Sequence, residues 1–193
     1  MKELVFVTNN KHKLAEIREI LDGHFAIRSL AEIGFSEEIE ETAPDLEGNA
    51  LLKARHIHDR FGWNCFADDT GLEVAALGGA PGVYSARYAG EDATYADNVN
   101  KLLEAMAGIA DRSARFRTVI ALILDDKEYL FDGAVDGEIL TEEAGSSGFG
   151  YDPVFRPVGL DLSFAEMSSI EKNAISHRGR AVEKLKSFLM DLK

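Results

Sequence analysis

The amino-acid sequence predicts one mixed α/β domain over residues 1–193. Short apolar runs with β-branched members alternate with segments whose apolar residues repeat at helical spacing. No internal repeat, low-complexity tract or linker rich in proline or serine divides the sequence into separate domains. Because 46% of the residues are hydrophobic, a chain of this length can bury a substantial core.

The first half of the chain is predicted to begin with a strand, a turn and a helix. In chain order, its expected elements are a strand over residues 4–7, a helix with Leu14, Ile17 and Leu21 on one face, a helix over 45–61, a short buried strand over 65–67, a turn-rich segment over 78–82 and a helix over 98–106.

The second half combines a β-hairpin with a closing helix. Residues 116–124 and 128–135 read as two strands on either side of Asp125-Asp126-Lys127. A glycine-rich loop over 145–150 precedes irregular chain. The last predicted helix places its apolar residues on one face, namely Ala181, Leu185, Phe188 and Leu192.

The overall charge and hydropathy exclude several classes of partner. With a formal net charge of −13 and scattered basic residues, the chain has no basic run that would bind a nucleic acid. Its longest apolar run, 119–124, is much shorter than the roughly 20 residues of a membrane span, and Met1-Lys2-Glu3 begins no signal peptide. The single cysteine, Cys65, excludes an internal disulfide and is expected to be buried. We therefore expect a cytoplasmic protein.

Residues 8–13 stand where the first strand passes into the first helix. Exposed amides at a helix N-terminus, asparagine side chains and a lysine can together bind a phosphate group. The alternative is that Asn10 only caps the helix and that both lysines are solvated. Both interpretations stay open for this segment, which has no Walker A pattern and reads Thr8, Asn9, Asn10, Lys11, His12, Lys13.

Acidic and basic residues also flank the second predicted helix. Glu40 and Glu41 precede it, and Asn49 and Lys53 are four residues apart on it, hence on the same face. A carboxylate and an amine can therefore face one cleft. A solvated surface is the commoner explanation for such residues taken singly.

Asp68 and Asp69 come directly after the strand predicted over 65–67, where open α/β sheets present ligand-binding groups. Adjacent, partly buried carboxylates repel each other, so a metal ion or a nearby cation should hold them ionised. Oxygen ligands suit Mg²⁺, which binds one or two carboxylates together with the phosphates of a substrate. The alternative is an acidic capping turn.

Two further segments carry side chains suited to a purine base. Phe149 lies between Gly148 and Gly150, so the backbone can approach a flat ligand while the ring stacks on it, although core packing is the usual role of phenylalanine. Asp152 can accept a hydrogen bond from a base edge. The last predicted helix begins with three basic residues, Lys172, His177 and Arg178. Positive charge at a helix start is unfavourable with respect to the helix dipole, so these residues are expected to have an anionic or carbonyl partner. His177 can alternatively bond the backbone.

Together these segments resemble the inosine/xanthosine triphosphate pyrophosphatase family. Seven motifs follow one another in the family's order over nearly the whole chain, which makes the resemblance highly specific. They are Thr8-Asn9-Asn10 with Lys13, Glu41-Thr42, Glu47-Gly48-Asn49-Ala50 with Lys53-Ala54, Ala67-Asp68-Asp69-Thr70-Gly71-Leu72, the segment from Leu77 to Arg87, Gly148-Phe149-Gly150-Tyr151-Asp152-Pro153, and the segment from Glu171 to Gly179.

The resemblance implies an elongated α/β fold in which helices flank a long mixed β-sheet, with two lobes around a central nucleotide-binding cleft, and a homodimer. It also implies a Mg²⁺-dependent reaction in which a nucleoside triphosphate and water give the monophosphate and pyrophosphate. The implied substrates are ITP, dITP, XTP and dXTP, whose removal keeps them out of DNA and RNA.

Site roles follow from the matching motif positions. Asp69 resembles the general base and a metal ligand, and Glu41 a second metal ligand; Asp68 and Lys53 complete the implied catalytic group. The implied phosphate site is the segment 8–13 together with Lys53. The implied substrate contacts elsewhere are Thr70, Phe149, Gly150, Tyr151, Asp152, Lys172, His177 and Arg178.

The sequence departs from the family's commonest pattern at three positions. Asn9 stands where glycine is frequent and Thr70 where serine is frequent, and both keep polar or turn-compatible chemistry. Tyr95 replaces an acidic residue often found before the helix over 98–106.

The principal rival function is a regulator that binds purine nucleotides without turnover. The acidic pair beside an anion site favours the enzyme, and the net charge opposes a third reading, a polynucleotide-binding module.

Overall fold

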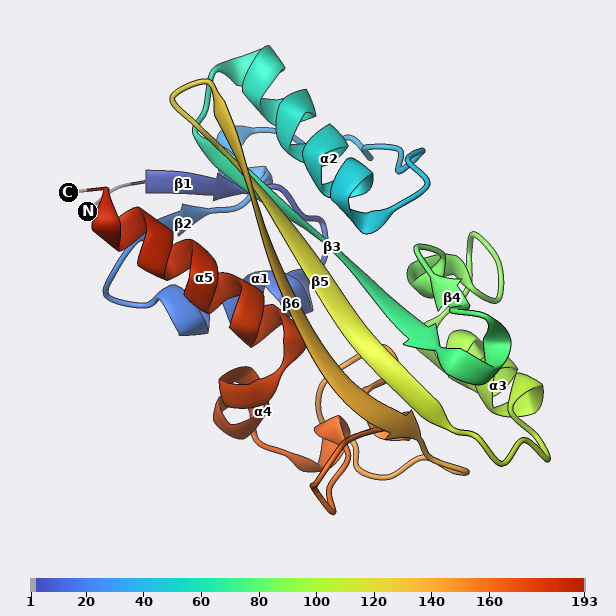
Figure 1. The fold of residues 1–193 in the computed structure, drawn as a ribbon. Coiled ribbons are helices and arrows are strands. Elements are labelled where there is room, and N and C mark those ends of the chain that lie inside the picture. Colours follow the sequence, from blue (N-terminus) through green and yellow to red (C-terminus); the bar gives the residue numbers. More distant parts are fainter. Residues whose placement is uncertain (1–2, 193) are drawn as a thin grey trace. The chain divides into compact units, whose positions relative to one another are not determined.

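The computed structural model describes residues 3–192, and over this range seven strands and five helices form an α/β fold (Figure 1). The strands are β1 (Glu3–Phe6), β2 (Ala26–Arg28), β3 (Cys65–Val74), β4 (Pro81–Gly82), β5 (Ser113–Leu124), β6 (Lys127–Ile139) and β7 (Phe155–Pro157). The helices are α1 (Lys11–Leu21), α2 (Leu46–Phe61), α3 (Tyr95–Ala105), α4 (Ser169–Ile175) and α5 (His177–Asp191).

The strands form one mixed sheet in the order β2-β1-β3-β5-β6-β7, with β4 paired to β3. β1 runs parallel to β2 and to β3, whereas β3 with β4 and β6 with β7 are antiparallel. The predicted mixed α/β fold class is therefore confirmed.

Local sequence signals explain where the main helices begin and end. The side chain of Asn10 accepts hydrogen bonds from the amides of His12 and Lys13, which caps α1. Asp45 caps α2 through the amide of Gly48 at 2.7 Å, and α2 ends at Gly62 with a left-handed φ of 69°. The helix predicted over 45–61 is thus nearly the one observed, and the predicted helical residues Leu14, Ile17 and Leu21 lie on α1.

The predicted hairpin is present, and its strands are longer than expected. β5 and β6 extend the predicted strands by several residues, because alternation of exposed and buried residues continues beyond the apolar runs. Asp125 and Asp126 form the turn with φ values of 51° and 62°, the left-handed backbone that suits a tight hairpin.

Two sequence-based placements are corrected. The strand predicted to end at residue 67 continues to Val74, where Leu72 and Glu73 pair with β4, so Asp68 and Asp69 lie inside a strand. Lys172 lies on α4, a short helix of its own. The extended backbone of Ser176 ends that helix before α5 begins.

Contacts divide the described residues into two compact units. The first comprises residues 3–69, 118–133 and 178–192, and the second comprises residues 70–117 and 134–177. Each unit has its own hydrophobic core. The single domain, the elongated shape and the lobes around a cleft stay predictions.

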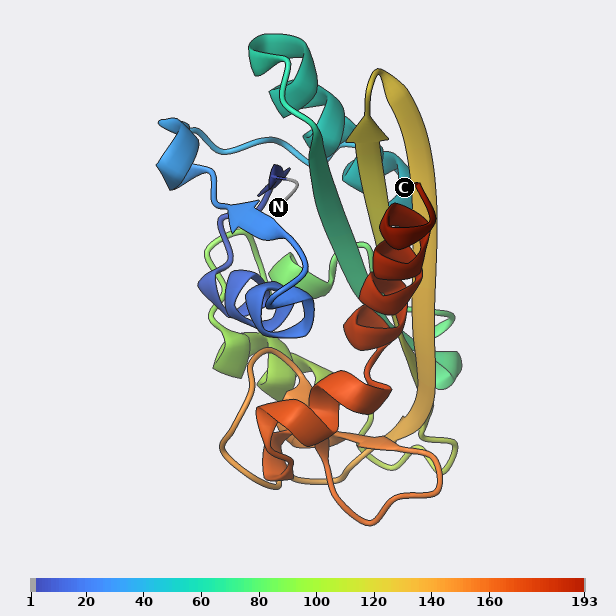
Figure 2. The same ribbon diagram turned by 90° about the vertical axis from the view of Figure 1, so that its left-hand side faces the viewer.

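In the first unit, helices pack on both faces of the strands (Figures 1 and 2). α1 and α5 cover one face, and the core there comprises Leu4, Phe6, Phe66, Ile120 and Leu122 from the strands with Ile17, Leu21, Ala181, Val182, Leu185 and Leu189 from the helices. α2 lies on the other face, where the thiol of the buried Cys65 donates to the carbonyl oxygen of Ala54 at 3.2 Å. The expected burial of Cys65 is thus confirmed.

In the second unit, α3 packs on its own core through Val99 and Leu102. Other members of that core are Leu72, Val74, Phe116, Val135, Tyr151, Phe155 and Phe164. Among the residues that the structure describes, no helix is long and apolar enough to cross a membrane.

Candidate active site

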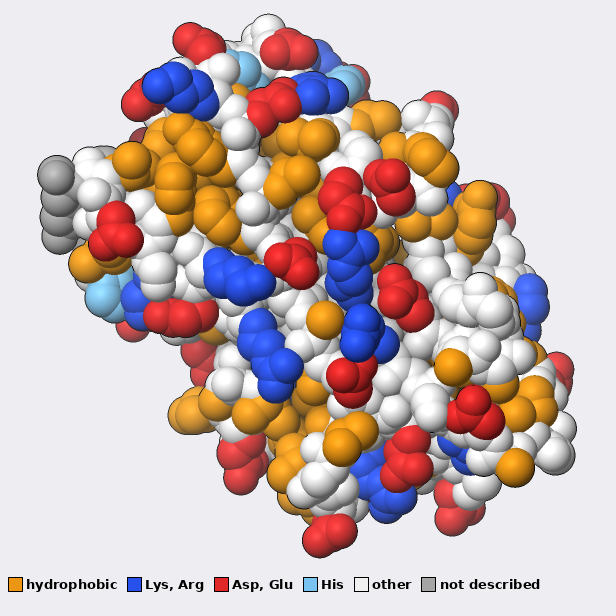
Figure 3. Space-filling model, viewed as in Figure 1, with side chains coloured by type: hydrophobic (Ala, Val, Ile, Leu, Met, Phe, Trp, Pro, Cys, Tyr) orange, Lys and Arg blue, Asp and Glu red, His pale blue; other side chains and the backbone are white. Residues whose placement is uncertain are grey.

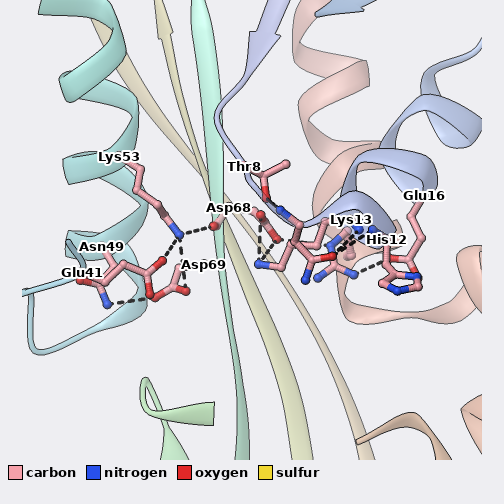
Figure 4. A network of polar contacts seen from close by, with 11 residues as sticks. Thr8, His12, Lys13, Glu16, Glu41, Asn49, Lys53, Asp68 and Asp69 are labelled. Atoms are coloured by element: carbon pink, nitrogen blue, oxygen red, sulfur yellow. Dashed lines mark hydrogen bonds and ion pairs between the residues drawn. The ribbon is translucent and has the colours of Figure 1, made fainter. Parts of the chain in front are cut away.

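The two adjacent aspartates of β3 point in opposite directions (Figure 4). Successive side chains of a strand lie on opposite faces of the sheet. Asp68 is therefore directed toward α1 and Lys13, whereas Asp69 is directed toward α2, Asn49 and Lys53. As expected, each carboxylate has a cation nearby: Lys13 on the face of Asp68 and Lys53 on the face of Asp69. Because the two carboxylates point to opposite faces, they repel each other less.

Asp68 is the centre of a buried ion network. Its carboxylate accepts from Nζ of Lys13 at 3.1 Å and from Nε of Arg178 at 3.3 Å, and its side chain has no exposed surface. Arg178 also donates to Glu16 of α1. Burial alone raises the pKa of Asp68, but the charges of Lys13, Arg178 and Lys53 outweigh it and hold that pKa well below its usual range. This setting favours the ionised form of Asp68.

The turn before α1 bears out part of the structural alternative, since Asn10 is a helix cap and Lys11 is exposed, while phosphate binding stays a prediction. Asn10 caps the helix, as the structural alternative supposed. Lys13, however, is paired with Asp68 and is not a solvated surface lysine. Burial, together with Arg178 and Lys53, lowers its pKa. Thr8 accepts from the amide of Asn10 at 3.1 Å, and the neighbouring exposed residues are Asn9, Lys11 and His12.

Asp69 is held on the opposite face by residues of α2. Nδ2 of Asn49 donates to its Oδ2 at 3.1 Å, and Nζ of Lys53 lies 3.8 Å from its Oδ1. Lys53 also donates to Glu41 and, at 2.8 Å, to the carbonyl oxygen of Asp68. The four-residue spacing of Asn49 and Lys53 therefore brings an amide and an amine to one carboxylate, as their shared helix face predicted.

The environment of Asp69 differs from that of Asp68 in its effect on acidity. Burial raises the pKa of Asp69 above its usual value, and the nearby charge of Glu41 adds to this, while Lys53 opposes it. A raised pKa makes this carboxylate a better proton acceptor than an ordinary aspartate. Two neighbouring carboxylates whose pKa values are pushed apart are typical of an acid–base site.

Glu41 and Asp69 are the residues that the sequence nominated as metal ligands. Both contact Lys53, so their oxygen atoms lie in one neighbourhood. Between residues 3 and 192 no group of three or more His, Cys, Asp or Glu side chains is arranged as a metal site. Two carboxylates with substrate phosphates and water are nevertheless the donor set that Mg²⁺ uses most often.

A second group of predicted residues comes together in the second unit. The Asp152 carboxylate accepts from the backbone amide of Phe149 at 2.9 Å and from Nζ of Lys172 at 2.7 Å. The Lys172 ammonium lies 4.8 Å from the centre of the Phe149 ring, within cation–π range. Gly148 has a φ of 73°, and a Cβ there would lie 2.1 Å from the Asp152 carboxylate, so only glycine fits. Asp152 thus holds the loop of Gly148, Phe149 and Gly150, called the Phe149 loop below, through the Phe149 amide.

Other predicted residues have mainly buried positions. Tyr151 is 5% exposed and its hydroxyl donates to the carbonyl oxygen of Ser85 at 2.8 Å. Burial raises its pKa above the usual tyrosine value. The ring of His177 stacks on that of Phe116 with centroids 4.5 Å apart. Thr70 and Gly150 are partly buried.

Sequence reasoning missed the partner of Arg178. Glu16 is a part-buried residue of α1, and its sequence signal was weak: it follows Lys13 by three positions and so shares a helix side with it. Asn49 was placed on the correct face of α2 but was not nominated as a site residue, although it is fully buried and donates to Asp69.

Comparison with known proteins agrees with this geometry. The sequence model of the Ham1 family matches residues 4–188. A relative from Porphyromonas gingivalis, named dITP/XTP pyrophosphatase, is 58% identical over 98% of each chain, and one of the same name from Flavobacterium johnsoniae is 52% identical over 95% of each.

Solved structures of Ham1 proteins share the fold of this chain. The Ham1 protein of Staphylococcus aureus aligns with a TM-score of 0.90 at 39% identity over 100% of both chains. A HAM1 protein of Coxiella burnetii gives a TM-score of 0.90 at 43% identity, covering 99% of this chain and 100% of its own. With matching sequence and fold over nearly its whole length, the chain belongs to the Ham1 family.

Proposed function

We propose that this protein hydrolyses non-standard purine nucleoside triphosphates, namely ITP, dITP, XTP and dXTP, to the monophosphate and pyrophosphate. The observation that carries this proposal is the setting of Asp69. It is a buried carboxylate of raised pKa, held by Asn49 and beside Lys53, in a chain whose relatives are named dITP/XTP pyrophosphatases. The reaction cleaves an acid anhydride and prevents incorporation of these nucleotides into DNA and RNA.

We assign the triphosphate to residues of the first unit. The positive end of the α1 dipole favours an anion at this turn, where the Asn10 side chain already accepts from the amides of His12 and Lys13. Lys13 and Lys53 add two positive charges beside the two aspartates. Thr8, Asn9, Asn10, Lys11 and His12 supply further polar groups at the same turn. These groups would offset the charge that develops on the phosphates during cleavage.

Glu41 and Asp69 would hold Mg²⁺, since both are oxygen donors close to Lys53. When bound, the ion supplies positive charge to the phosphates and lowers the pKa of a coordinated water.

Asp69 is assigned the proton transfer. Its carboxylate orients a water molecule and accepts a proton from it while the water oxygen bonds to the α-phosphorus. The bond between that phosphorus and the bridging oxygen breaks, and pyrophosphate leaves. Asn49 fixes the carboxylate by donating to its other oxygen, at 3.1 Å from Oδ2. Asp68 keeps Lys13 in place through their ion pair.

We assign the purine base to the Phe149 loop of the second unit. The Phe149 ring would stack on the base, while Lys172 donates to an oxygen of the base and Asp152 accepts from a base N–H. Thr70, Gly150, Tyr151, His177 and Arg178 are the other proposed substrate residues. The paired setting of Arg178 with Asp68 and Glu16 makes its proposed contact dependent on that network.

A polynucleotide partner is not favoured. On the face seen in Figure 3, lysine and arginine side chains lie among acidic ones. Exposed ion pairs of the described residues include Lys184 with Asp132 at 3.1 Å. Mixed charges of this kind form no continuous basic track. We further propose a homodimer in the cytoplasm, and sedimentation at micromolar concentration tests the dimer.

Product analysis tests the proposed reaction. Purified protein incubated with ITP and Mg²⁺ should release pyrophosphate and IMP in equal amounts, and chelation of the metal should stop the release. Release of orthophosphate and IDP would show a different bond cleavage. Tight binding of ITP without any product would favour the regulator that binds nucleotides without turnover.

A further inference from the structure

Tyr95 is an exposed aromatic residue beside the loop to which we assign the base. Its side chain is 44% exposed, and its ring centroid lies 6.0 Å from that of Phe149 with the rings tilted by 46°. This distance is within the range in which aromatic pairs attract each other. The contact joins two segments more than fifty residues apart in the chain.

Phe149 lies in a loop, outside the helices and strands of the described residues. Gly148 and Gly150 flank the residue and both have left-handed φ values, 73° and 61°. Asp152 fixes the backbone amide of Phe149, and Lys172 lies over its ring. A backbone hydrogen bond does not fix a side-chain rotamer, so the orientation of the ring depends on contacts made by the ring itself. A contact from a more rigid element would restrict the ring further.

Tyr95 comes from such an element. It is the first residue of α3, whose N-terminus is closed by a reciprocal capping box between Thr94 and Asp97. Three residues later, on the same side of the helix, the buried Asn98 accepts from the amide of Ala89 at 2.7 Å and donates to the carbonyl oxygen of Ala86 at 3.0 Å. The capping box and the hydrogen bonds of Asn98 therefore fix the backbone at the start of α3, from which the Tyr95 side chain extends.

We propose that Tyr95 is a positioning residue for base binding, which holds the Phe149 ring in the orientation that stacks on the purine. This inference rests on the proposed function, because it takes the Phe149 loop as the base site. The chemistry fits a planar aromatic ligand, for which stacking depends on ring orientation.

Substitution of Tyr95 at the first position of α3 supplies a matched test variant. An aspartate at the first position of a helix interacts favourably with the helix dipole, so Tyr95→Asp should leave α3 at least as stable while removing the ring. Tyr95→Phe keeps the ring and removes only the hydroxyl group. Phe149→Ala removes the proposed stacking surface itself. Thermal unfolding of each variant shows whether the fold is retained.

The readout is the change in KM and kcat for ITP hydrolysis. Given the usual strength of an aromatic pair, Tyr95→Asp should raise KM about two- to tenfold and change kcat less than twofold, whereas Tyr95→Phe should match the wild type. Inhibition by inorganic triphosphate, which has no base, should be equal in all of these proteins.

Three results would overturn the inference. If Phe149→Ala raises KM and Tyr95→Asp does not, the base site stands and Tyr95 has no part in it. If Tyr95→Asp weakens inhibition by inorganic triphosphate as much as it raises KM for ITP, its effect is not on the base. If Phe149→Ala leaves KM unchanged, the assignment of the base to this loop is itself wrong and the role of Tyr95 falls with it.

Discussion

At the scale of single residues, the central feature is that neighbours in β3 have opposite chemical settings. Asp68 has a lowered pKa because three cations outweigh its burial, whereas burial raises the pKa of Asp69. The strand's alternation puts them on separate faces, so each responds to a different helix. One carboxylate therefore serves as a fixed anion, and the other is suited to accept a proton.

We predict that Asp69→Asn lowers kcat for ITP at least about 10²-fold while nucleotide binding is retained, because the amide keeps the shape but cannot accept the proton. Stability should not fall. A raised carboxyl pKa means that the ionised form is less favourable in the folded protein, so an uncharged side chain removes that cost above the pKa. Kinetics with equilibrium binding measure both quantities, and near-normal turnover would exclude Asp69 as the base.

Asp68→Asn is the informative comparison for that variant. It leaves the buried charges of Lys13 and Arg178 with less compensation, so we expect a clear loss of unfolding free energy where Asp69→Asn shows none. Equal stability loss in both variants would mean that the two carboxylates do not have the separate settings described.

The sequence nominated side chains that the structure brings together, but it did not predict all of their contacts. Acidic neighbours, an asparagine–lysine turn and a glycine-flanked phenylalanine each have a recognisable chemistry in sequence alone. The sequence did not predict that Asp68 and Asp69 lie on opposite faces of the sheet. The apolar run ends at residue 67 and gives no sign that the strand continues. The role of Glu16 depends on a contact with Arg178, 162 positions away, which no local pattern encodes.

At the scale of secondary-structure elements, Arg178 joins three parts of the first unit. It lies at the start of α5, is 1% exposed, and pairs with Asp68 of β3 and Glu16 of α1. Burial opposes its charge, but the two carboxylates raise its pKa above the usual value. The same side chain is proposed to contact the base, so its structural and functional roles are coupled.

We predict that Arg178→Ala slows the favoured substrates and also destabilises the protein by about 3–5 kcal/mol, because two carboxylates lose their buried partner. Urea unfolding measures the second effect. Glu16→Gln, which keeps the residue's shape and leaves the Asp68 pair intact, should cost much less. If Arg178→Ala were as stable as the wild type, the network would not be holding α5 to α1 and β3.

A histidine joins the end of α2 to the hairpin turn. Nδ1 of His58 lies 2.9 Å from the carbonyl oxygen of Trp63, and Nε2 lies 2.9 Å from the carboxylate of Asp126. Both partners only accept, so both bonds form together only when the imidazole carries two protons. The Trp63 carbonyl, with Asp126 and Asp59, raises the pKa of His58 despite partial burial.

We predict a pH-dependent contribution of His58 to stability. Because its folded-state pKa is raised, its stabilising effect should be fully present below the unfolded value of about 6.5 and be lost as pH rises through the higher folded value. The difference in unfolding free energy between wild type and His58→Gln should therefore shrink from pH 5.5 to pH 9. A constant difference would contradict this, and Asp126→Asn should reduce the pH effect.

At the scale of the whole molecule, the fold class was predictable and its internal division was not. Hydrophobic periodicity located the hairpin and four of the five helices of the described residues, because their packing follows the local pattern, whereas α4 was not predicted as a separate helix. The long strands β3, β5 and β6 each contribute residues to both compact units, so a break in packing falls within continuous elements and leaves no linker in the sequence.

Selective hydrolysis is the central claim for the molecule as a whole. Cells contain large amounts of ATP and GTP, so an enzyme of this kind has to discriminate through the base. Donors such as Lys172, His177 and Arg178 would pair with the C6 oxygen of inosine and xanthosine but would face an amino group in adenine. Guanine shares the C6 oxygen, so its rejection has to act on the C2 amino group, for which the wall from Phe149 to Asp152 is the proposed element.

The most direct test is the steady-state kcat/KM of the wild-type protein for ITP, dITP, XTP, ATP and GTP, measured as pyrophosphate release with Mg²⁺. The three non-standard substrates should exceed ATP and GTP by at least about 10²-fold, which corresponds to roughly 2.7 kcal/mol of transition-state binding. If ATP were cleaved as efficiently as ITP, the proposed removal of non-standard purine nucleotides would be contradicted, even with the hydrolytic chemistry intact.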